Sequence, residues 1–407
     1  WPASQTTLAD LSEEALDLAR LNACRLGLGS VQILRSDLFD KISGRFDLIV
    51  SNLPYIPSGE IAGLSREVRR DPRLALEQFW LLLRQLRARG VGDIAGDLVL
   101  DRSAFSLPPH DPAEFDNEPL RPYNAGPDAL LVNLKSLRLT LRADAVGRSV
   151  HILPETPSEG LQLVNRLQFV DEACGDWREK LRITLDADRI ELTGKYAASC
   201  GDKALFLSPW PADVQVGRLF RALWREMGGT LRGKVREGVT PATAYPIAVQ
   251  ESPPLAEIVR DVNKYSNNVM ARQIFLTLDA NRPATPEGAQ RRVQGWLAEK
   301  RLNLPELVVD NGSGLSRSER ISADGLSRML LAAWQSPVMP ELVSSLPIMS
   351  IDGTLKRRMN GSSLSGRAHL KTGYLDGVRA LAGYVLDSEN RRWVLVFLIN
   401  DAKSLAG

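Results

Sequence analysis

Cysteine is scarce in this sequence of 407 residues, which has only Cys24, Cys174 and Cys200. None of them stands in a Cys-x-x-Cys pair, which excludes a disulfide-stapled small domain and a zinc site built on such pairs. Buried free thiols are the simplest interpretation of the three residues. A single disulfide between Cys174 and Cys200 is the alternative if the chain resides in an oxidising compartment.

Charge of one sign and long apolar runs are also lacking. The 51 basic and 49 acidic residues leave a net charge of +2, which offers no basic surface for nucleic acid or an anionic membrane. The longest apolar run, Trp393 to Ile399, is far shorter than the ~20 residues of a transmembrane helix. The first ten residues lack the basic and apolar stretches of a secretory signal peptide, and the first methionine is Met227. We therefore expect an N-terminus that was processed, trimmed or never complete.

Residues 1–78 have the pattern of alternating strands and helices. A helix is expected from Ser12 to Leu26, where acidic residues fill the first turn and apolar residues then recur at helical spacing. Val31 to Leu34 and Phe46 to Val50 are short apolar runs typical of buried parallel strands. This segment predicts a piece of a doubly wound α/β domain.

From residue 79 the pattern changes. Phe79 to Arg89 predicts an amphipathic helix, and the remainder of 79–237 predicts largely β structure with Pro- and Gly-rich turns. The strand candidates are Gly96 to Leu100, Ala129 to Asn133, Arg138 to Leu141, Arg182 to Leu185 and Arg189 to Leu192.

Residues 238–407 return to a mixed pattern. One long helix is expected from Leu255 to Leu278 and another from Ala323 to Trp334. Arg379 to Leu386 and Trp393 to Ile399 predict two adjacent antiparallel strands.

Two short motifs in this last region carry chemistry, Ser266-Asn267-Asn268 and Lys371-Thr372-Gly373. Each motif alone is weak evidence for a function, because a Ser-x-Asn is expected about once by chance in a chain of this size. Together and in this order they fit the serine D,D-peptidase pattern of Ser-x-x-Lys, then Ser-x-Asn, then Lys-Thr-Gly. In that pattern a serine and a lysine one helical turn apart supply the nucleophile and its base.

The same pattern gives roles to six residues of this chain. The catalytic ones are Ser266, which passes a proton to the leaving amine, Asn268, which holds a substrate amide, and Lys371. Lys371 and Thr372 bind the terminal carboxylate, Gly373 lets the substrate lie close as an added strand, and the N–H of Tyr374 completes the oxyanion hole.

Residues from about 79 to the end resemble the D-alanyl-D-alanine carboxypeptidase/endopeptidase family of low-molecular-mass penicillin-binding proteins with large inserted domains. The stretches that carry this resemblance are Leu83 to Gly90, Gly96 to Ser103, Pro122 to Asn133, Glu251 to Asn268, Asp310 to Leu315, Asp352 to Leu355 and His369 to Gly373. The resemblance implies an α+β serine D,D-peptidase/β-lactamase-like domain, an acyl-serine mechanism on peptidoglycan stem peptides, inhibition by β-lactams, no metal or cofactor, and a periplasmic location.

One part of the pattern is missing, because no lysine in the chain has a serine three positions before it. Cys200-Gly-Asp-Lys203 has the spacing with a thiol, but its position in the β region favours a structural role. His369 is expected on the same strand face as Lys371, and the family assigns it no function. We predict that the polypeptide as it stands is inactive as a peptidase, and a non-catalytic peptidoglycan-binding protein is the alternative.

Residues 1–76 resemble a different family, the glutamine methyltransferases that modify peptide-chain release factors. Asp10 is placed like the acidic residue that holds the ribose of S-adenosylmethionine, and Asp37 like the residue that approaches the adenine. Asn52-Leu-Pro-Tyr55 is similar to the Asn-Pro-Pro-Tyr motif, whose Asn holds the substrate amide. The Gly-rich first loop is absent and Leu53 replaces the first proline, so we expect no cofactor binding. Helix and turn capping is the alternative role of the three polar residues.

We interpret the chain as two unrelated fragments that meet near residues 77–79, through a join in the reading frame or assembly. The expected division is 1–78, a methyltransferase piece of a cytoplasmic family, 79–237, the inserted β domains, and 238–407, the remaining catalytic domain. On this hypothesis Trp1 lies inside a methyltransferase sequence. Methyl transfer from S-adenosylmethionine is the alternative enzymatic function.

Overall fold

The computed structural model describes residues 6–10, 13–25, 27, 31–35 and 73–401. The chain divides into two compact units, residues 1–69 and 70–407, which are described separately. In the first unit, β1 (Thr6–Asp10) and β2 (Val31–Arg35) pair in parallel and are connected by α1 (Glu13–Arg25). The helix and the strand at Val31 confirm the prediction. The strand expected from Phe46 to Val50 lies outside the described residues.

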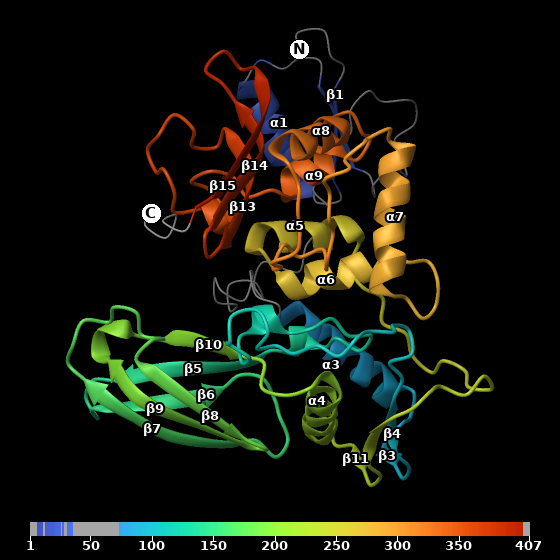
Figure 1. Cartoon of the computed structure of the whole chain (residues 1–407), viewed down its shortest axis with the longest axis vertical. Helices are drawn as coiled ribbons and strands as arrows, with labels where there is room; N and C mark the ends of the chain where they lie inside the picture. The colour runs from blue at the N-terminus through green and yellow to red at the C-terminus, as the bar shows by residue number, and fades with distance from the viewer. Residues whose placement is uncertain (1–5, 11–12, 26, 28–30, 36–72, 402–407) are drawn as a thin grey trace. The chain divides into compact units, whose positions relative to one another are not determined.

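The second unit begins with α3 (Arg73–Ala88), which starts before the predicted Phe79 and continues through the expected junction at 77–79. It packs against α4 (Ala212–Glu226), and the shared core is formed by Leu83 of α3 and by Leu219, Phe220, Leu223 and Trp224 of α4 (Figure 1). The sequence did not predict α4, so this region is less purely β than expected.

Short parallel strands join the start and the end of this region. β3 (Asp93–Ile94) pairs with β11 (Thr230–Leu231), and β4 (Leu98–Leu100) pairs with β12 (Val235–Glu237). The segment between β4 and β12 is therefore an insertion whose two ends lie side by side.

Two three-stranded sheets form the β part of the insertion (Figure 1). One has the order β10-β5-β6 and the other β7-β9-β8, and they share one core in which Leu139, Leu141, Ile190, Leu192 and Tyr196 are buried. The strands are β5 (Leu137–Asp144), β6 (Ser149–Pro154), β7 (Gln162–Val170), β8 (Leu181–Asp186), β9 (Arg189–Ala197) and β10 (Lys203–Leu207).

The strand predicted from Ala129 to Asn133 is wrong. The Asp128 carboxylate accepts a hydrogen bond from the Leu130 N–H at 2.9 Å, so that this donor is used locally and not in a strand ladder. A short 3₁₀ helix, Asn133–Lys135, follows, and its three residues have φ between 49° and 52°. Left-handed backbone of this kind cannot continue a strand.

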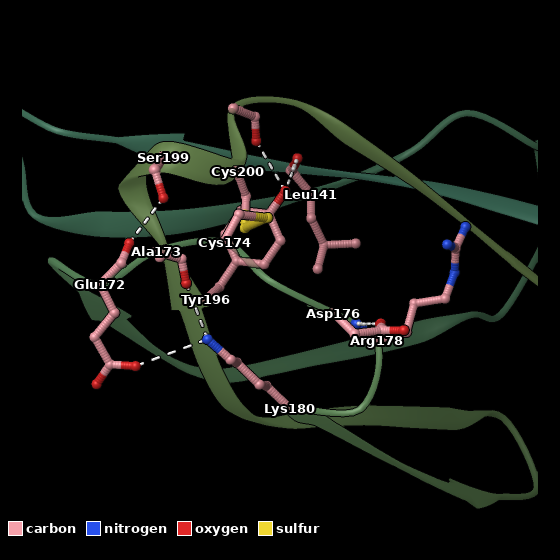
Figure 2. Close-up of a disulfide and its surroundings, with 11 residues drawn as sticks. Leu141, Glu172, Ala173, Cys174, Asp176, Arg178, Lys180, Tyr196, Ser199 and Cys200 are labelled. Carbon is pink, nitrogen blue, oxygen red and sulfur yellow. Dashed lines mark hydrogen bonds and ion pairs between the residues drawn. A yellow bond between two sulfur atoms is a disulfide. The ribbon is translucent and has the colours of Figure 1, made fainter. Parts of the chain in front are cut away.

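Cys174 and Cys200 form a disulfide, and Cys24 is an exposed free cysteine. The interpretation as buried free thiols is therefore wrong, and the alternative disulfide is confirmed. Figure 2 shows Tyr196 beside the bond, where its hydroxyl donates to the Gly201 carbonyl at 2.8 Å. Cys200 has no thiol to offer, which agrees with the structural role expected for Cys200-Gly-Asp-Lys203.

The last part of the unit contains a helical group and a three-stranded antiparallel sheet in the order β13-β14-β15. The helices are α5 (Leu255–Tyr265), α6 (Asn268–Thr277), α7 (Pro286–Glu299), α8 (Ala323–Trp334) and α9 (Met339–Ser345), and the strands are β13 (Ala368–Leu375), β14 (Val378–Leu386) and β15 (Arg392–Asn400). The predicted helix from Ala323 and both predicted strands are confirmed. Among the described residues, no helix is long and apolar enough to span a bilayer.

The single helix expected from Leu255 to Leu278 is wrong, because the chain breaks at Ser266. Ser266 is left-handed, with φ 52° and ψ 47°, and ends α5. Asn267 then begins α6, since its side-chain oxygen accepts a hydrogen bond from the Met270 N–H at 3.0 Å. The break places Ser266 in a turn and not on a helix face.

Candidate active site

The structure brings the two short motifs into contact. Lys371 lies on β13 and its Nζ donates a hydrogen bond to Ser266 Oγ, from a position 105 residues further along the chain. The same ammonium donates to the Thr372 carbonyl at 2.7 Å. Asn268, the third residue of the first motif, begins α6 two residues after Ser266.

Lys371 is largely buried, and burial lowers the pKa of its amine to about 8. Desolvation disfavours the charged form, and within the described residues no carboxylate lies close enough to Lys371 to offset it. The amine of Lys371 therefore changes charge near neutral pH, in contrast to an exposed lysine.

Thr372, whose carbonyl accepts from this amine, also carries a hydroxyl that meets another threonine. Its Oγ1 lies 3.1 Å from Oγ1 of Thr354, which belongs to the 3₁₀ turn Gly353–Leu355. Gly353 has φ 56°, and a Cβ there would lie 2.8 Å from the Lys264 carbonyl, so the turn requires glycine for two independent reasons. Thr372 therefore contacts the Lys371 amine through its carbonyl and the Thr354 hydroxyl through its own side chain.

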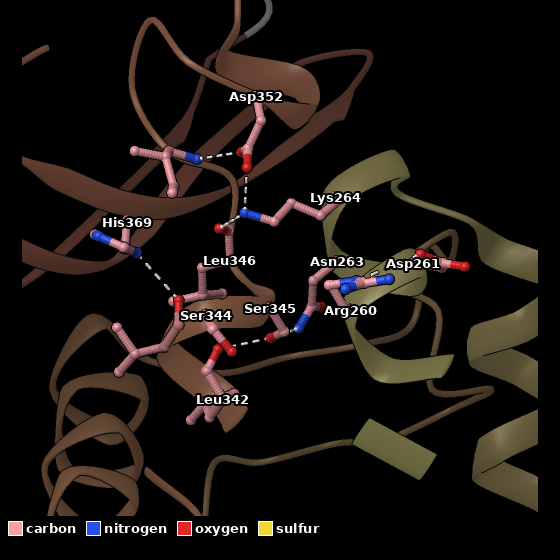
Figure 3. A network of polar contacts seen from close by, with 12 residues as sticks. Arg260, Asp261, Asn263, Lys264, Leu342, Ser344, Ser345, Leu346, Asp352 and His369 are labelled. Carbon is pink, nitrogen blue, oxygen red and sulfur yellow. Dashed lines mark hydrogen bonds and ion pairs between the residues drawn. The ribbon is translucent and has the colours of Figure 1, made fainter. Parts of the chain in front are cut away.

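An ion pair between a buried lysine and a partly exposed aspartate supports this turn. Lys264 Nζ donates to Asp352 Oδ2 at 2.7 Å and to the Leu346 carbonyl at 2.6 Å, while Asp352 Oδ1 accepts from the Ile348 N–H at 2.8 Å (Figure 3). Lys264 is only 7% exposed. The pair links the last turn of α5, which leads to Ser266, to the segment that carries Thr354.

Sequence reasoning did not identify Lys264, Thr354 or the role of Asp352. The stretches Glu251 to Asn268 and Asp352 to Leu355 carried part of the family resemblance, and this was the available signal for all three. Nothing in the local pattern of α5 marks Lys264, because its partner lies 88 residues away.

Gly373 and Tyr374 follow on β13 and are exposed, and β13 lies at one edge of the sheet formed by the described strands. The Arg379 guanidinium lies 3.6 Å from the centre of the Tyr374 ring. Ala380 is opposite Gly373 in the ladder, and a Cβ at Gly373 would lie 3.0 Å from the Ala380 Cβ. The backbone of Gly373 and Tyr374 is therefore exposed at the edge of the sheet, next to the polar site at Lys371.

His369 shares β13 with Lys371, but its Nδ1 lies 3.1 Å from the Val343 carbonyl (Figure 3). Burial lowers its pKa, which favours a neutral imidazole held by this contact. The geometry gives His369 a structural contact with α9, in line with the expectation that it is not a base.

The predicted methyltransferase residues are in the other unit. Asp10 is the last residue of β1, where strand and helix follow each other as expected. Asp37 and Asn52 lie outside the described residues.

A cavity of about 600 Å³ has Arg272 and Phe275 of α6, His110 and Asp310 among its lining residues. Arg272 is buried and donates to the Ala125 carbonyl at 3.0 Å. None of the predicted peptidase residues lines this cavity. In the described part of the chain, no group of three or more His, Cys, Asp or Glu residues is arranged to hold a metal ion.

Comparison with known proteins finds relatives from two different families for the two segments of the chain. Release factor glutamine methyltransferase of Deinococcus radiodurans is 49% identical to this chain over 75 residues, which are 18% of this chain and 27% of that enzyme. The resemblance of a short segment to this family is thereby confirmed.

The larger segment matches carboxypeptidases. D-alanyl-D-alanine carboxypeptidase DacB of Haemophilus influenzae is 24% identical over 335 residues, 81% of this chain and 70% of DacB. The D-alanyl-D-alanine carboxypeptidase of an Actinomadura species is 29% identical over 353 residues, and the chain covers 80% of its own length and 64% of that enzyme.

The fold agrees with this assignment. The crystal structure of penicillin-binding protein 4 (DacB) of H. influenzae matches with a TM-score of 0.66 at 24% identity, over 81% of this chain and 74% of that chain. The same protein has also been crystallised with a β-lactam. The family model of the D-Ala-D-Ala carboxypeptidase 3 (S13) family matches residues 63–407, a range that begins before the expected junction at 77–79. The chain therefore belongs to the D-Ala-D-Ala carboxypeptidase 3 (S13) family.

Proposed function

We propose that Ser266, Asn268, Lys371 and Thr372 form the substrate-recognition part of a D,D-peptidase site for peptidoglycan stem peptides. The observation that carries this proposal is the hydrogen bond from Lys371 to Ser266, which assembles two motifs that are distant in sequence. The Ser-x-Asn and Lys-Thr-Gly motifs of the chain therefore contribute residues to the same site.

The chemistry of this place suits a peptide that ends in a carboxylate. Below a pH of about 8 the Lys371 amine is charged, and the neighbouring residue Thr372 offers a hydroxyl that contacts the hydroxyl of Thr354. A carboxylate accepts charge-assisted hydrogen bonds from such donors. The exposed backbone at Gly373 and Tyr374 lets a peptide add to β13 as a further strand, which provides main-chain hydrogen bonds.

A polypeptide of these 407 residues binds such peptides without cleaving them by the family mechanism, because it contains no Ser-x-x-Lys. The acyl-serine mechanism needs that serine as nucleophile and that lysine as base. For the same reason a β-lactam forms no stable acyl bond to it, although the H. influenzae relative has been crystallised with one.

Binding is measured by isothermal titration calorimetry with an N-acetylated peptide that ends in D-Ala-D-Ala. We expect saturable binding at pH 7 that Lys371→Met weakens about tenfold or more, since it removes a charged donor to the carboxylate. Lys300→Met, on an exposed lysine at the end of α7, is the matched control and leaves binding unchanged. Equal binding by all three proteins would refute the proposal.

The disulfide supports a periplasmic location. Cys174 and Cys200 form a bond that persists in oxidising compartments and is rarely maintained in the cytosol. This is tested by alkylating thiols in intact cells and then separating the periplasmic and cytosolic fractions. In protein from the periplasmic fraction, we expect Cys24 to be alkylated and Cys174 and Cys200 to be protected. Alkylation of all three cysteines in the cytosolic fraction would contradict the location.

A second function, methyl transfer, is raised by the 49% identity of the short segment to a methyltransferase. The match covers only 27% of that enzyme, and Leu53 replaces the first proline of the Asn-Pro-Pro-Tyr motif. We therefore propose that the segment does not bind S-adenosylmethionine. Saturable binding of the cofactor to the full chain in a calorimetric titration would reverse this conclusion.

A further inference from the structure

Ser266 and Lys371 are the serine and lysine that the structure joins in a direct side-chain contact. No other side-chain partner of Ser266 Oγ is found among the described residues, and Lys371 otherwise contacts only the Thr372 carbonyl there. The serine hydroxyl and the lysine amine are therefore not engaged by competing side chains.

The surroundings hold Ser266 in one place. It occupies the left-handed turn between α5 and α6, where Asn267 caps the following helix. Two residues earlier, Lys264 is fixed to Asp352 and to the Leu346 carbonyl. A polar residue in a strained backbone conformation that its neighbours enforce is a recurrent property of functional sites.

Burial also favours the neutral form of the Lys371 amine, which is the form that acts as a base. A neutral amine accepts a proton from a serine hydroxyl, whereas an ammonium ion does not. Because the pKa of Lys371 is lowered to about 8, a substantial share of the amine is neutral in mildly alkaline solution. Serine nucleophiles with a lysine base occur on several unrelated folds.

We propose that Ser266 and Lys371 form a serine-lysine dyad that hydrolyses small activated aryl esters. Ser266 Oγ attacks the ester carbonyl carbon and its proton moves to Lys371 Nζ. The bond from carbon to the aryl oxygen breaks, and the phenolate leaves with the electron pair. The proton on Lys371 returns to solvent, and Lys371 then takes a proton from the water that attacks the acyl-serine. This releases the carboxylic acid and restores Ser266.

An activated ester is required because the dyad supplies a nucleophile and a base, whereas the oxyanion hole of the peptidase pattern is built around a different serine. A phenolate leaves without acid catalysis, and an amide nitrogen does not. This activity goes beyond the proposed recognition of D-Ala-D-Ala peptides and does not depend on it. Replacement of Lys371 affects both properties, but the unaltered chain can show peptide binding without ester turnover, or ester turnover without peptide binding, so a failure of one proposal is distinguishable from a failure of the other.

The first test is the steady-state hydrolysis of p-nitrophenyl acetate by the full chain at about pH 8.5, after any initial burst. We expect Ser266→Ala and Lys371→Met each to lower the turnover rate about 100-fold, within the range for loss of a nucleophile's base. The matched controls Ser344→Ala and Lys300→Met change an exposed serine and an exposed lysine, and we expect both to keep the rate of the unaltered chain. Unchanged turnover in Ser266→Ala overturns the proposal.

The second test needs no variant, so that a folding defect cannot obscure it. Phenylmethanesulfonyl fluoride transfers its sulfonyl group to an activated serine, with an oxygen-sulfur bond formed and fluoride released. We expect peptide mass mapping to find the sulfonyl group on Ser266, with labelling that increases as the pH is raised from about 7 to about 9. Labelling elsewhere with Ser266 unmodified, or acetylation of Lys371 by the ester without turnover, contradicts the dyad.

Discussion

Lys371 Nζ, on strand β13, donates a hydrogen bond to Ser266 Oγ at the end of α5. The two residues belong to motifs that are 105 positions apart, and no lysine in the chain has a serine three positions before it. On the function proposed above, the recognition part of the site is assembled by α5, α6, the turn at Gly353 and β13, without the first motif of the peptidase pattern.

The burial of Lys371 predicts a specific dependence of stability on pH. Its folded pKa is about 8, below the ordinary value of 10.5, so the unfolded chain binds more protons between these two values. The free energy of unfolding should therefore rise with pH from about 8 to about 10.5 through this residue, and should not vary with pH because of it below about pH 7.

The measurement is chemical denaturation of the unaltered chain and of Lys371→Met across this range of pH. Because other lysines titrate in both proteins, only the difference between the two unfolding free energies reports on Lys371. A difference that is constant with pH would show that the amine is not buried in the folded chain.

The left-handed conformation of Ser266 predicts that glycine is better tolerated there than alanine. Both variants lose the contact with Lys371, but only alanine keeps a Cβ that disfavours φ 52°. We expect Ser266→Gly to be more stable than Ser266→Ala by about 1 kcal/mol in urea denaturation. If Ser266→Ala were instead the more stable variant by about 1 kcal/mol, Ser266 would lie in ordinary helical backbone, as one continuous helix would require.

The ion pair between Lys264 and Asp352 predicts a larger loss. Lys264→Met leaves Asp352 without its cationic partner and removes the bond to the Leu346 carbonyl, so we expect the free energy of unfolding to fall by about 1.5–3 kcal/mol. The control is Arg142→Met, which breaks an exposed ion pair with Asp202 and should cost no more than about 1 kcal/mol. Similar small losses in both variants would show that the buried pair does not hold the turn.

The disulfide predicts a stabilisation of the inserted β sheets. Cys174 and Cys200 close a loop of 26 residues, so replacing both by serine should lower the free energy of unfolding by about 3 kcal/mol. Replacing the exposed Cys24 by serine should change it by no more than about 0.5 kcal/mol. The check is denaturation of the two variants and of the unaltered chain, with a thiol titration that finds one reactive cysteine before reduction and all three afterwards. Three reactive cysteines before reduction would exclude the bond.

The sequence predicted the elements whose own pattern is strong. β14, β15 and α8 have long periodic runs of apolar residues, and the structure confirms them. The order of the two motifs predicted that Ser266 and Lys371 serve one site, and their contact agrees with that prediction. The local pattern of apolar residues was sufficient to predict a helix or strand wherever the element buries one of its faces.

Other features depend on partners that no local pattern shows. The break at Ser266 was missed because Ser266 ends one helix and Asn267 begins the next within an apolar periodicity that continues on both sides. The segment from Ala129 was read as a strand because its apolar residues are contiguous, but Asp128 takes the N–H that a ladder needs. Lys264 and Asp352 pair across 88 residues, which neither composition nor spacing reveals.

The central claim is that this polypeptide retains the recognition part of a D-Ala-D-Ala carboxypeptidase site and lacks the serine that forms a stable acyl bond. Incubation of the full chain with a fluorescent penicillin, followed by denaturing electrophoresis and peptide mass mapping, tests it most directly. The account predicts no fluorescent band that survives denaturation, while the D-Ala-D-Ala peptide still binds in calorimetry. A stable penicilloyl adduct on any serine of the chain would contradict it.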